Sequence, residues 1–532
     1  MFYPAKAITA LFLSGHASSA SAQTPPAAEQ STGFNSTFAL TPDQIVATNL
    51  SDAEATSLNN VLRFDRSQLA NGGPHEDDFY TLPPLTNSST GPLEPGTLLK
   101  TQAFTDPSTF AIPPNTALSR ILYTTRTHNG TVVPATAFIL WPFTARNIVT
   151  ASATGNQHAQ QRDKAEEKRS YDDQIKPTGG AGAPVVLWTH GTSGFFASAA
   201  PSSHRALWYG DAAPFTLALE GYAVVAPDYA GLGISTTWGE GGGDTQKIPH
   251  QYLMSRISAR DGLYALRAAR AAFAEALDAR FVAMGHSQGG GAAWSVAEVL
   301  SDEEGKTPEE FADLAPGYRG AVAGSPTTDV FTGWPSLIAP FVALALGSVF
   351  PSFQLADWFT PVGAARVKLF RELEGSIGAA QQLFLGDGAA QLLKDGWNET
   401  WYVEAYGKLA NAGRRPFRGP LLVLQGTEDV YVPYSVTNAT VAATCAAHPD
   451  SALEFLVVNG TGHVPTLDAT RQIWLDWIQD RFEGRPAATE GRGCKRTEMG
   501  SFLPMGWYLK VGNAFPQWAG APEYSYQVPL GL

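Results

Sequence analysis

Short, continuous apolar runs alternate with helical segments along most of the chain, and this alternation constrains the fold more than any other feature. Continuous apolar runs indicate strands that are buried on both faces, as in a parallel sheet covered by helices on each side. We therefore expect an α/β fold with a mostly parallel central sheet. The expected strands are 185–188, 223–226, 281–284, 320–323, 421–424 and 455–458, and the expected helices are 214–220, 256–280, 288–300 and 468–482.

Other segments depart from this alternation and suggest how the chain is divided. The β-rich runs 120–126 and 132–141 flank Asn129-Gly130, which indicates a hairpin. Residues 23–115 are rich in Ser, Thr, Pro and Asn and are expected to form an irregular arm. Segment 143–183 is polar, which predicts an exposed insertion. Segment 326–415, rich in Trp, Phe and Leu, predicts a helical cap or, alternatively, a peripheral helical layer. The core would then comprise 116–325 and 416–485, followed by a C-terminal extension, 486–532.

One short motif carries reactive chemistry. The run Gly285-His286-Ser287-Gln288-Gly289 matches G-x-S-x-G, directly after the expected strand 281–284 and directly before the expected helix 288–300. A nucleophile elbow needs this strand–turn–helix setting, because its serine occupies a tight and strained corner. The context therefore makes Ser287 the expected nucleophile, in preference to a plain glycine-rich turn.

A serine hydroxyl needs a base, and the base needs an acid that orients it. In folds with this elbow the chain order is serine, acid, histidine. Asp429, in the turn after strand 421–424, is the expected acid, and the neighbouring Glu428 is its rival. His463, in the Gly-rich loop after strand 455–458, is the expected base. His448 also follows the acid, but it lies in a turn before that last strand.

The tetrahedral intermediate of such chemistry carries an oxyanion that needs hydrogen-bond donors. The backbone N–H of Gln288, the residue after the nucleophile, is one expected donor. The loop Trp188-Thr189-His190-Gly191-Thr192 follows an earlier strand and should supply the other. Thr192 is the preferred residue and Gly191 the alternative.

Asp228 also follows an expected strand and could serve as an acid. Its neighbours Pro227 and Gly231 are turn formers, which favours a structural role in a turn. The sequence holds no His, Asp or Glu cluster with metal-ligand spacing and no dinucleotide fingerprint, so we expect neither a metal nor a cofactor.

Several motifs in the same order along the chain resemble the secretory lipase branch of the α/β-hydrolases, a group of fungal and bacterial ester hydrolases. The resemblance spans roughly residues 115–485, and it implies an eight-stranded core, a cap before the acid strand, acyl-ester substrates and no cofactor. The polar insertion 143–183 and the long terminal extensions depart from that pattern. The motifs are His190-Gly191-Thr192-x-Gly194, Ala226-Pro227-Asp228-Tyr229-x-Gly231-Leu232-Gly233, Asp261-x-Leu263-x-Ala265-Leu266-Arg267, Gly285-His286-Ser287-Gln288-Gly289-Gly290 and Gly462-His463.

The N-terminus and the sequons point to secretion. Lys6, the apolar run 7–15 and Ala20-Ser21-Ala22 have the layout of a signal peptide over residues 1–22. Cys445 and Cys494 are the only cysteines, and an oxidising compartment would pair them. The N-x-S/T sequons would be glycosylated at the surface of an extracellular protein. These sequons start at Asn35, Asn49, Asn87, Asn129, Asn398, Asn438 and Asn459.

Charge and hydropathy limit the classes of partner that we expect. The net charge of −13 argues against nucleic acid or an anionic membrane as a partner. The longest apolar run, 337–350, is shorter than the ~18 residues of a membrane span, so we expect no integral membrane association. The expected partner is a small-molecule or lipid ester. The oligomeric state stays open.

The sequence thus predicts a secreted serine ester hydrolase that works through an acyl-enzyme. The same residues would serve an acyltransferase, in which an alcohol replaces water. A serine peptidase is a weaker alternative because no recognition domain is apparent. A catalytically inactive binding protein of this fold would be expected to lack Ser287, Asp429 or His463, and all three are present.

Overall fold

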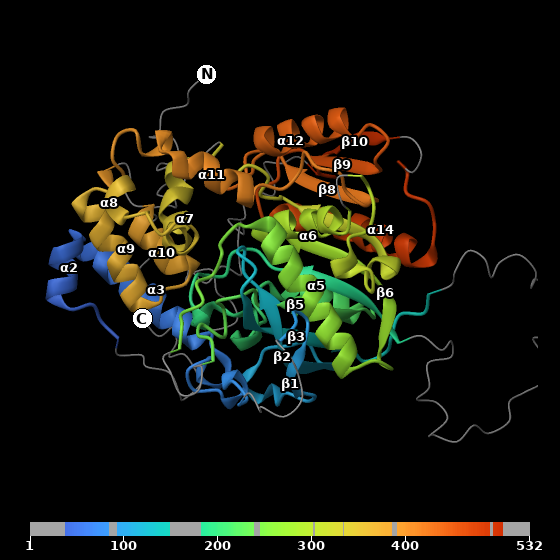
Figure 1. The fold of residues 1–532 in the computed structure, drawn as a ribbon, viewed down its shortest axis with the longest axis horizontal. Helices are drawn as coiled ribbons and strands as arrows, with labels where there is room; N and C mark the ends of the chain where they lie inside the picture. The colour runs from blue at the N-terminus through green and yellow to red at the C-terminus, as the bar shows by residue number, and fades with distance from the viewer. Residues whose placement is uncertain are drawn as a thin grey trace, which may run out of the picture.

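A mixed sheet of ten strands forms the centre of the molecule (Figure 1). The structure, a computed structural model, describes residues 38–84, 93–148, 182–238, 245–301, 304–332, 335–385, 391–489 and 493–503. The strand order is β1-β2-β3-β5-β4-β6-β7-β8-β9-β10. The pairs β1–β2, β2–β3 and β3–β5 are antiparallel, and the other pairs in the sheet are parallel. The expected hairpin and the mostly parallel sheet are therefore confirmed.

The strands and helices have the following bounds. The strands are β1 Leu98–Gln102, β2 Thr116–Arg126, β3 Val132–Pro142, β4 Ala183–Thr189, β5 Ala223–Pro227, β6 Leu277–His286, β7 Tyr318–Gly324, β8 Leu421–Gly426, β9 Leu453–Val458 and β10 Cys494–Met499. The helices are α2 Pro42–Thr48, α3 Asp52–Ser67, α4 Pro214–Leu219, α5 Ser255–Ala272, α6 Gln288–Val299, α7 Pro335–Val349, α8 Leu355–Trp358, α9 Pro361–Leu373, α10 Ile377–Phe384, α11 Trp401–Ala410, α12 Tyr434–Ala447, α13 Pro465–Ala469 and α14 Arg471–Glu483.

Alternate residues of the central strands enter two different apolar layers. In β4, Val185 and Leu187 pack with α5 and α6, whereas Val186 and Trp188 pack with α4 and α14. Every residue of this strand is buried, because helices cover both faces of the sheet. This two-sided burial explains why the parallel strands are continuous apolar runs.

One expected helix is shorter than its sequence pattern suggests. The Ala- and Arg-rich stretch 256–280 predicted a single helix, but α5 ends at Ala272 and β6 begins at Leu277. Leu277 pairs with Ala183 of β4, and the Arg280 guanidinium lies 2.5 Å from the Asp278 carboxylate. Pairing with a neighbouring strand thus outweighs the helical propensity of these residues.

The expectation of an irregular arm over 23–115 is wrong for the part that the structure describes. This part contains α2, α3 and the edge strand β1. Its polar residues form helix caps: Thr41 with Gln44, and Ser51 with Glu54, make reciprocal capping boxes. A polar composition that suggested a loop therefore marks the starts of two helices.

The segment 326–415 contains helices α7 to α11, which lie beside the sheet in Figure 1 together with α2 and α3. The buried side chains of these helices form an apolar cluster separate from the two sheet layers. Arg366 of α9 joins the two parts by donating to the backbone carbonyls of Thr48 and Asn49. The N-terminal helices thus belong to the cap, and we use "cap" for α7–α11 with α2 and α3.

The C-terminal extension begins as a further strand of the sheet. β10 runs parallel to β9, and a disulfide between Cys445 of α12 and Cys494 ties this edge strand to the core. The expected pairing of the two cysteines is therefore confirmed. The expected signal peptide, Asn35, Asn87 and most of the insertion 143–183 lie outside the described residues.

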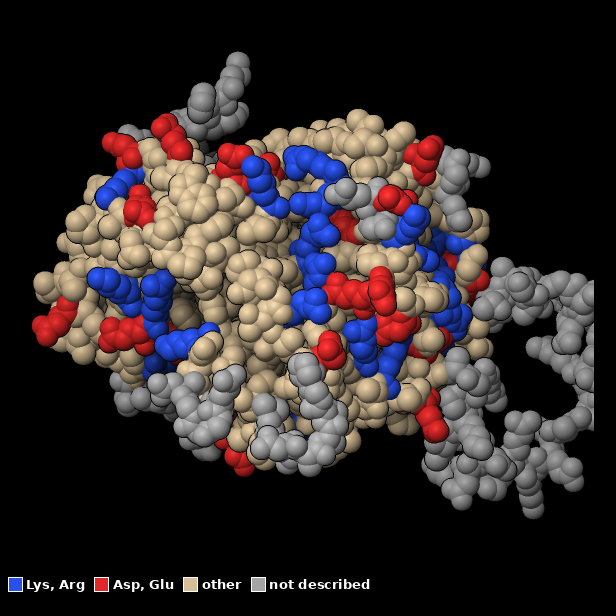
Figure 2. All heavy atoms as spheres, in the orientation of Figure 1, with Lys and Arg blue, Asp and Glu red and all other residues tan. Residues whose placement is uncertain are grey.

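Charged side chains of both signs share the face shown in Figure 2, where Lys and Arg form a band beside groups of Asp and Glu. Despite the net negative charge of the chain, this face therefore does not carry a uniformly negative electrostatic potential. Within the described ranges, no helix is both long enough and apolar enough to span a membrane.

Candidate active site

The turn between β6 and α6 holds Ser287 in a strained conformation. Its φ of 60° and ψ of −121° lie where residues with a side chain are rare. Its N–H donates to the carbonyl of Gly324 at 2.9 Å, which fixes the turn against β7. A Cβ at Gly289 would come within 1.9 Å of the Thr189 carbonyl oxygen, so only glycine fits there. This geometry matches the elbow expected from the sequence.

Asp429 lies buried in the turn after β8, and four hydrogen bonds hold its carboxylate. Oδ1 accepts from the N–H groups of Tyr431 and Val432, at 3.0 and 2.9 Å. Oδ2 accepts from the side-chain amide of Gln425 at 3.1 Å and faces Nδ1 of His463 at 2.7 Å. Because every oxygen is occupied, the carboxylate has one orientation.

The surroundings of Asp429 keep it ionised. Burial alone would raise its pKa, but the charge and hydrogen bond of His463 and the Val432 N–H outweigh burial and lower the pKa below its usual range. A fixed anion beside Nδ1 orients the imidazole and leaves Nε2 available on the opposite side of the ring. Asp429 therefore has the properties required of an orienting acid.

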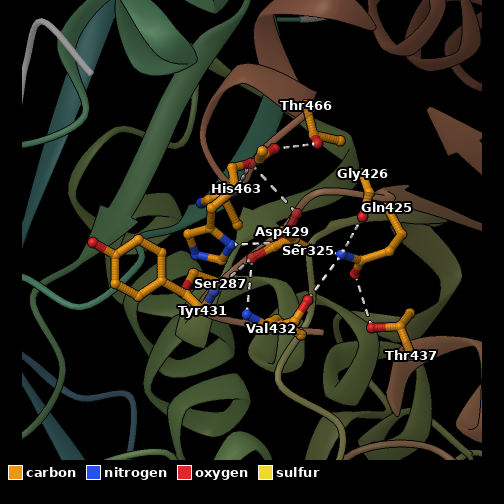
Figure 3. A network of polar contacts seen from close by, with 12 residues as sticks. Ser287, Ser325, Gln425, Gly426, Asp429, Tyr431, Val432, Thr437, His463 and Thr466 are labelled. Atoms are coloured by element: carbon orange, nitrogen blue, oxygen red, sulfur yellow. Dashed lines mark hydrogen bonds and ion pairs between the residues drawn. The ribbon is translucent and has the colours of Figure 1, made fainter. Parts of the chain in front are cut away.

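His463 follows β9 and is almost fully buried, at 2% exposure. In Figure 3 its ring lies between the Asp429 carboxylate and Ser287. The alternative acid and base lie elsewhere: Glu428 is exposed, and His448 is half-buried at the C-terminal end of α12. The structure thus brings together the three residues that the sequence singled out.

His286, the second residue of the elbow motif, was not assigned a role from the sequence. It is fully buried, with Nδ1 2.7 Å from the Tyr209 hydroxyl and Nε2 3.1 Å from the His463 carbonyl oxygen. Burial holds its pKa well below the usual value, so the ring is neutral. Nε2–H must then donate to the carbonyl and Nδ1 must accept from Tyr209. His286 therefore fixes the backbone of the candidate base.

The loop after β4 lies between the core and the cap. The Thr192 hydroxyl is 3.0 Å from that of Tyr252, and the Ser193 carbonyl accepts from the N–H of Ile377 in α10. Phe195 packs on Phe341 and Phe370, both in the cap. The loop that should supply one oxyanion donor is therefore positioned by the cap as well as by the sheet.

Gln288, the other expected donor, begins α6. The first N–H groups of a helix have no partner within it and lie at the positive end of its dipole, so they suit an anion. The side-chain amide of Gln288 donates to Nε2 of His250 at 3.0 Å. Burial lowers the pKa of His250 to about 3, so this ring is neutral and accepts the bond. His250 therefore keeps the Gln288 side chain in place.

Asp228 is buried in a different network. Its carboxylate accepts from the Thr136 hydroxyl at 2.6 Å and from the N–H and hydroxyl of Ser202. Burial raises its pKa to about 6. These contacts agree with a structural role in the turn after β5.

Among the described residues, no group of His, Cys, Asp and Glu could hold a metal ion. The asparagines of the expected sequons differ in their exposure. The sequon residues Asn49, Asn129, Asn398 and Asn459 are exposed. Asn438 is half-buried and accepts from Arg496 at 2.7 Å.

Comparison with known proteins identifies the framework of this site. A family model described as "Alpha/beta hydrolase family" matches residues 185–473, more than half of the chain. The structure is similar to Candida antarctica lipase A in its closed state, with a TM-score of 0.55, 15% identity, and coverage of 79% of this chain and 89% of that one. It is also similar to the rice cell wall degrading esterase LipA from Xanthomonas oryzae, with a TM-score of 0.51, 17% identity, and coverage of 72% and 100%. A search of curated protein sequences gives no match.

Proposed function

Because this chain belongs to the alpha/beta hydrolase family, we propose that it hydrolyses carboxylic esters with Ser287 as its nucleophile. One observation carries the proposal: a strained elbow presents Ser287 beside His463, whose Nδ1 lies 2.7 Å from an ionised and fully hydrogen-bonded Asp429 (Figure 3). A nucleophile, a base and an orienting acid in this order along the chain are the parts of acyl transfer through a serine.

In the proposed reaction, Ser287 attacks the ester carbonyl while Nε2 of His463 accepts the hydroxyl proton. Asp429 keeps Nδ1 protonated and stabilises the imidazolium that forms. The tetrahedral intermediate collapses, and His463 gives its proton to the departing alcohol. Water, activated by the same His463, then attacks the acyl-enzyme and releases the acid together with free Ser287.

The N–H groups of Gln288 and Thr192 are the proposed oxyanion donors. Gln288 supports this role through its place at the start of α6, where the helix dipole favours negative charge. Thr192 lies in the loop after β4, which adjoins the elbow: the Thr189 hydroxyl donates to the Gly289 carbonyl at 2.8 Å. Preorganised donors of this kind typically contribute 10²–10³-fold to the rate, or about 3–4 kcal/mol each.

The proposed substrate is a small-molecule or lipid ester, and no cofactor takes part in the steps above. The apolar cap reaches the candidate oxyanion loop through Phe195, so an acyl chain would meet apolar side chains beside the nucleophile. The names of the two similar structures, a lipase and an esterase, support an ester as the class of substrate.

The proposed location is extracellular. The signal-peptide layout of residues 1–22, the disulfide between Cys445 and Cys494, and four exposed sequon asparagines all support secretion with N-glycosylation.

The substrate class can be tested with p-nitrophenyl esters of increasing acyl length, assayed beside a peptide substrate, with and without an added alcohol. We expect ester hydrolysis; a preference for short acyl chains would define an esterase and a preference for long ones a lipase. Net transfer to the alcohol would favour the acyltransferase. Peptide cleavage without ester cleavage would contradict the proposal.

A further inference from the structure

Two of the chain crossings that join the cap to the core meet at an open hollow of about 630 Å³. The first crossing leads from β7 to α7 and contributes Asp329 and Phe331. The second leads from α11 to β8 and contributes Asn411 and Arg414. The side chain of Asn411 accepts from the N–H of Val330 at 3.0 Å, so the crossings touch each other. The volume falls within the range of about 300–1,000 Å³ that holds small ligands.

The charges around this hollow cancel locally. Lys408 lies 2.6 Å from Glu404, and Arg414 lies 3.8 Å from Asp329. Arg415 lies 3.8 Å from the buried Glu298. Charges of both signs are also side by side on the face shown in Figure 2. A lining whose cations already have carboxylate partners favours a neutral polar ligand over an anion, because an anion would have to compete with those carboxylates.

The remaining lining is amphipathic. Phe331 and Val403 supply apolar surface, and the amide nitrogen of Asn411 supplies donors, since its oxygen already accepts from Val330. A sugar ring has the matching character, with C–H groups on its faces and hydroxyl groups at its rim. The lining therefore suits a carbohydrate, as an apolar pocket with a few placed polar groups suits small ligands in general.

Asn398 also lines the hollow, and it begins the sequon Asn398-Glu399-Thr400. We propose that the hollow is the docking site of the N-linked glycan carried by Asn398, whose first sugars lie against these two crossings. The proposal depends on the proposed glycosylation but not on the ester chemistry. A covalent tether gives the first sugars an effective concentration in the millimolar range, so modest contacts suffice for docking.

A docked glycan would bridge α11 with the two crossings and so stabilise the cap against the core. Asn459 offers an internal comparison, because its exposed sequon follows β9 and does not line the hollow. Thr400 offers a second one: its hydroxyl accepts from Trp358 and donates to the Trp397 carbonyl, and serine would keep both bonds and the sequon.

The first test is release of the glycans from the folded protein, secreted by a eukaryotic host, by an endoglycosidase that cuts within the core disaccharide. Mass spectrometry of glycopeptides follows each sequon. If the glycan is docked about nine-tenths of the time, the enzyme reaches it about one-tenth of the time, so release at Asn398 should be about tenfold slower than at Asn459. After denaturation the two release rates should be equal. Equal rates in the folded protein, or an unoccupied Asn398 beside an occupied Asn459, would overturn the proposal. Absence of glycan from every sequon would overturn the proposed glycosylation with it.

The second test is limited proteolysis of Asn398→Gln, Thr400→Ser and Asn459→Gln. Asn398→Gln should be cut several-fold faster than the parent at the crossings, because the docked glycan no longer restrains their opening. Thr400→Ser and Asn459→Gln should match the parent. Identical cleavage in Asn398→Gln and the parent would contradict the bridging role. Hydrolysis of p-nitrophenyl esters, followed in parallel, reports separately on the proposed function.

Discussion

The turns after β5 and β8 each place a buried aspartate after a parallel strand, yet the two carboxylates differ in their chemistry. Asp228 is bound by hydroxyl and N–H groups, and its pKa is raised to about 6 by burial. Asp429 is bound by N–H groups and also by His463, and its pKa is lowered. Both are nearly inaccessible, at 0% and 5% exposure, so burial alone does not explain the difference.

The contrast shows how the candidate catalytic acid differs from a buried aspartate held only by neutral donors. Neutral donors satisfy a buried carboxylate but leave much of its desolvation cost uncompensated, so its proton is held more tightly. His463 offsets that cost through its electrostatic interaction and hydrogen bond with Asp429, which hold the pKa of this carboxyl low. A position after a strand is therefore insufficient to identify a candidate acid, and the facing histidine is what separates Asp429 from Asp228.

The largest expected effect comes from Asp429→Asn. An amide cannot stabilise the imidazolium and favours the wrong tautomer of His463, so kcat/KM for a p-nitrophenyl ester should fall by about 10³–10⁴-fold. The fold should remain, because Asn replaces Asp with almost the same shape; circular dichroism and thermal unfolding check this. A loss of less than tenfold in a folded variant would remove Asp429 from the mechanism.

Asp228→Asn should show the opposite pattern. Its amide nitrogen would face the donors Ser202 and Thr136, so at pH 5 the free energy of unfolding should fall by about 1–2 kcal/mol. Activity per folded molecule should stay within about tenfold of the parent, since the partners of the Asp228 carboxylate are Thr136 and Ser202 and not the candidate catalytic residues. Urea unfolding and ester hydrolysis measure the two effects. Abolished activity at unchanged stability would reverse the roles assigned to the two aspartates.

The free energy of unfolding should depend on pH in opposite directions for the aspartates with raised pKa values and for Asp429. Asp261 is a buried residue of α5 whose carboxylate accepts from the Thr125 hydroxyl and the Ala230 N–H. Burial raises the pKa of Asp228 to about 6 and that of Asp261 to about 7, above the ordinary value of 3.8. Between these values the folded protein binds more protons than the unfolded chain, so each carboxyl lowers the free energy of unfolding as pH rises. The limit is about 1.4 kcal/mol per pH unit for each group. The lowered pKa of Asp429 gives the opposite sign, and only below about pH 4.

Urea unfolding of the parent and Asp228→Asn between pH 4.5 and 8 checks this expectation. The cost of the substitution should shrink as pH rises through about 6, because the variant has no carboxyl to ionise. A cost that is constant over the range would show that Asp228 has no raised pKa in the folded state.

The smallest expected effect is at Gln425, which donates to Asp429 at 3.1 Å from the end of β8. Gln425→Met keeps the length but removes the donor, so kcat should fall about fivefold, or about 1 kcal/mol, with KM unchanged. Thr437→Val is the control, because Thr437 contacts only the other end of the Gln425 amide. Equal losses in both variants would indicate a general packing defect.

Much of this architecture could be predicted from the sequence. The buried parallel strands are continuous apolar runs, and Ser287, Asp429 and His463 follow three of them in order. These residues are fixed by the geometry of the sheet edge, where the carboxyl ends of parallel strands meet. Their order along the chain therefore carried information about their positions in space.

The edge of the sheet and the residues that support the site could not be predicted in this way. β10 has the sequence Cys-Lys-Arg-Thr-Glu-Met and is almost wholly exposed, so only its pairing with β9 makes it a strand. The helix α3 was missed because its caps are the polar residues that suggested a loop. His286 and Tyr209 meet across 77 residues of chain, a contact that no local pattern encodes.

The most direct test of the central claim is covalent labelling at Ser287. A serine-directed phosphonate is added to the active protein, and peptide mass spectrometry locates the adduct while ester hydrolysis is followed. We predict one adduct per chain on the peptide that contains Ser287, loss of hydrolysis in proportion to labelling, and neither labelling nor hydrolysis in Ser287→Ala. Inactivation with the adduct on another residue, or hydrolysis by Ser287→Ala at the parent's rate, would contradict the account.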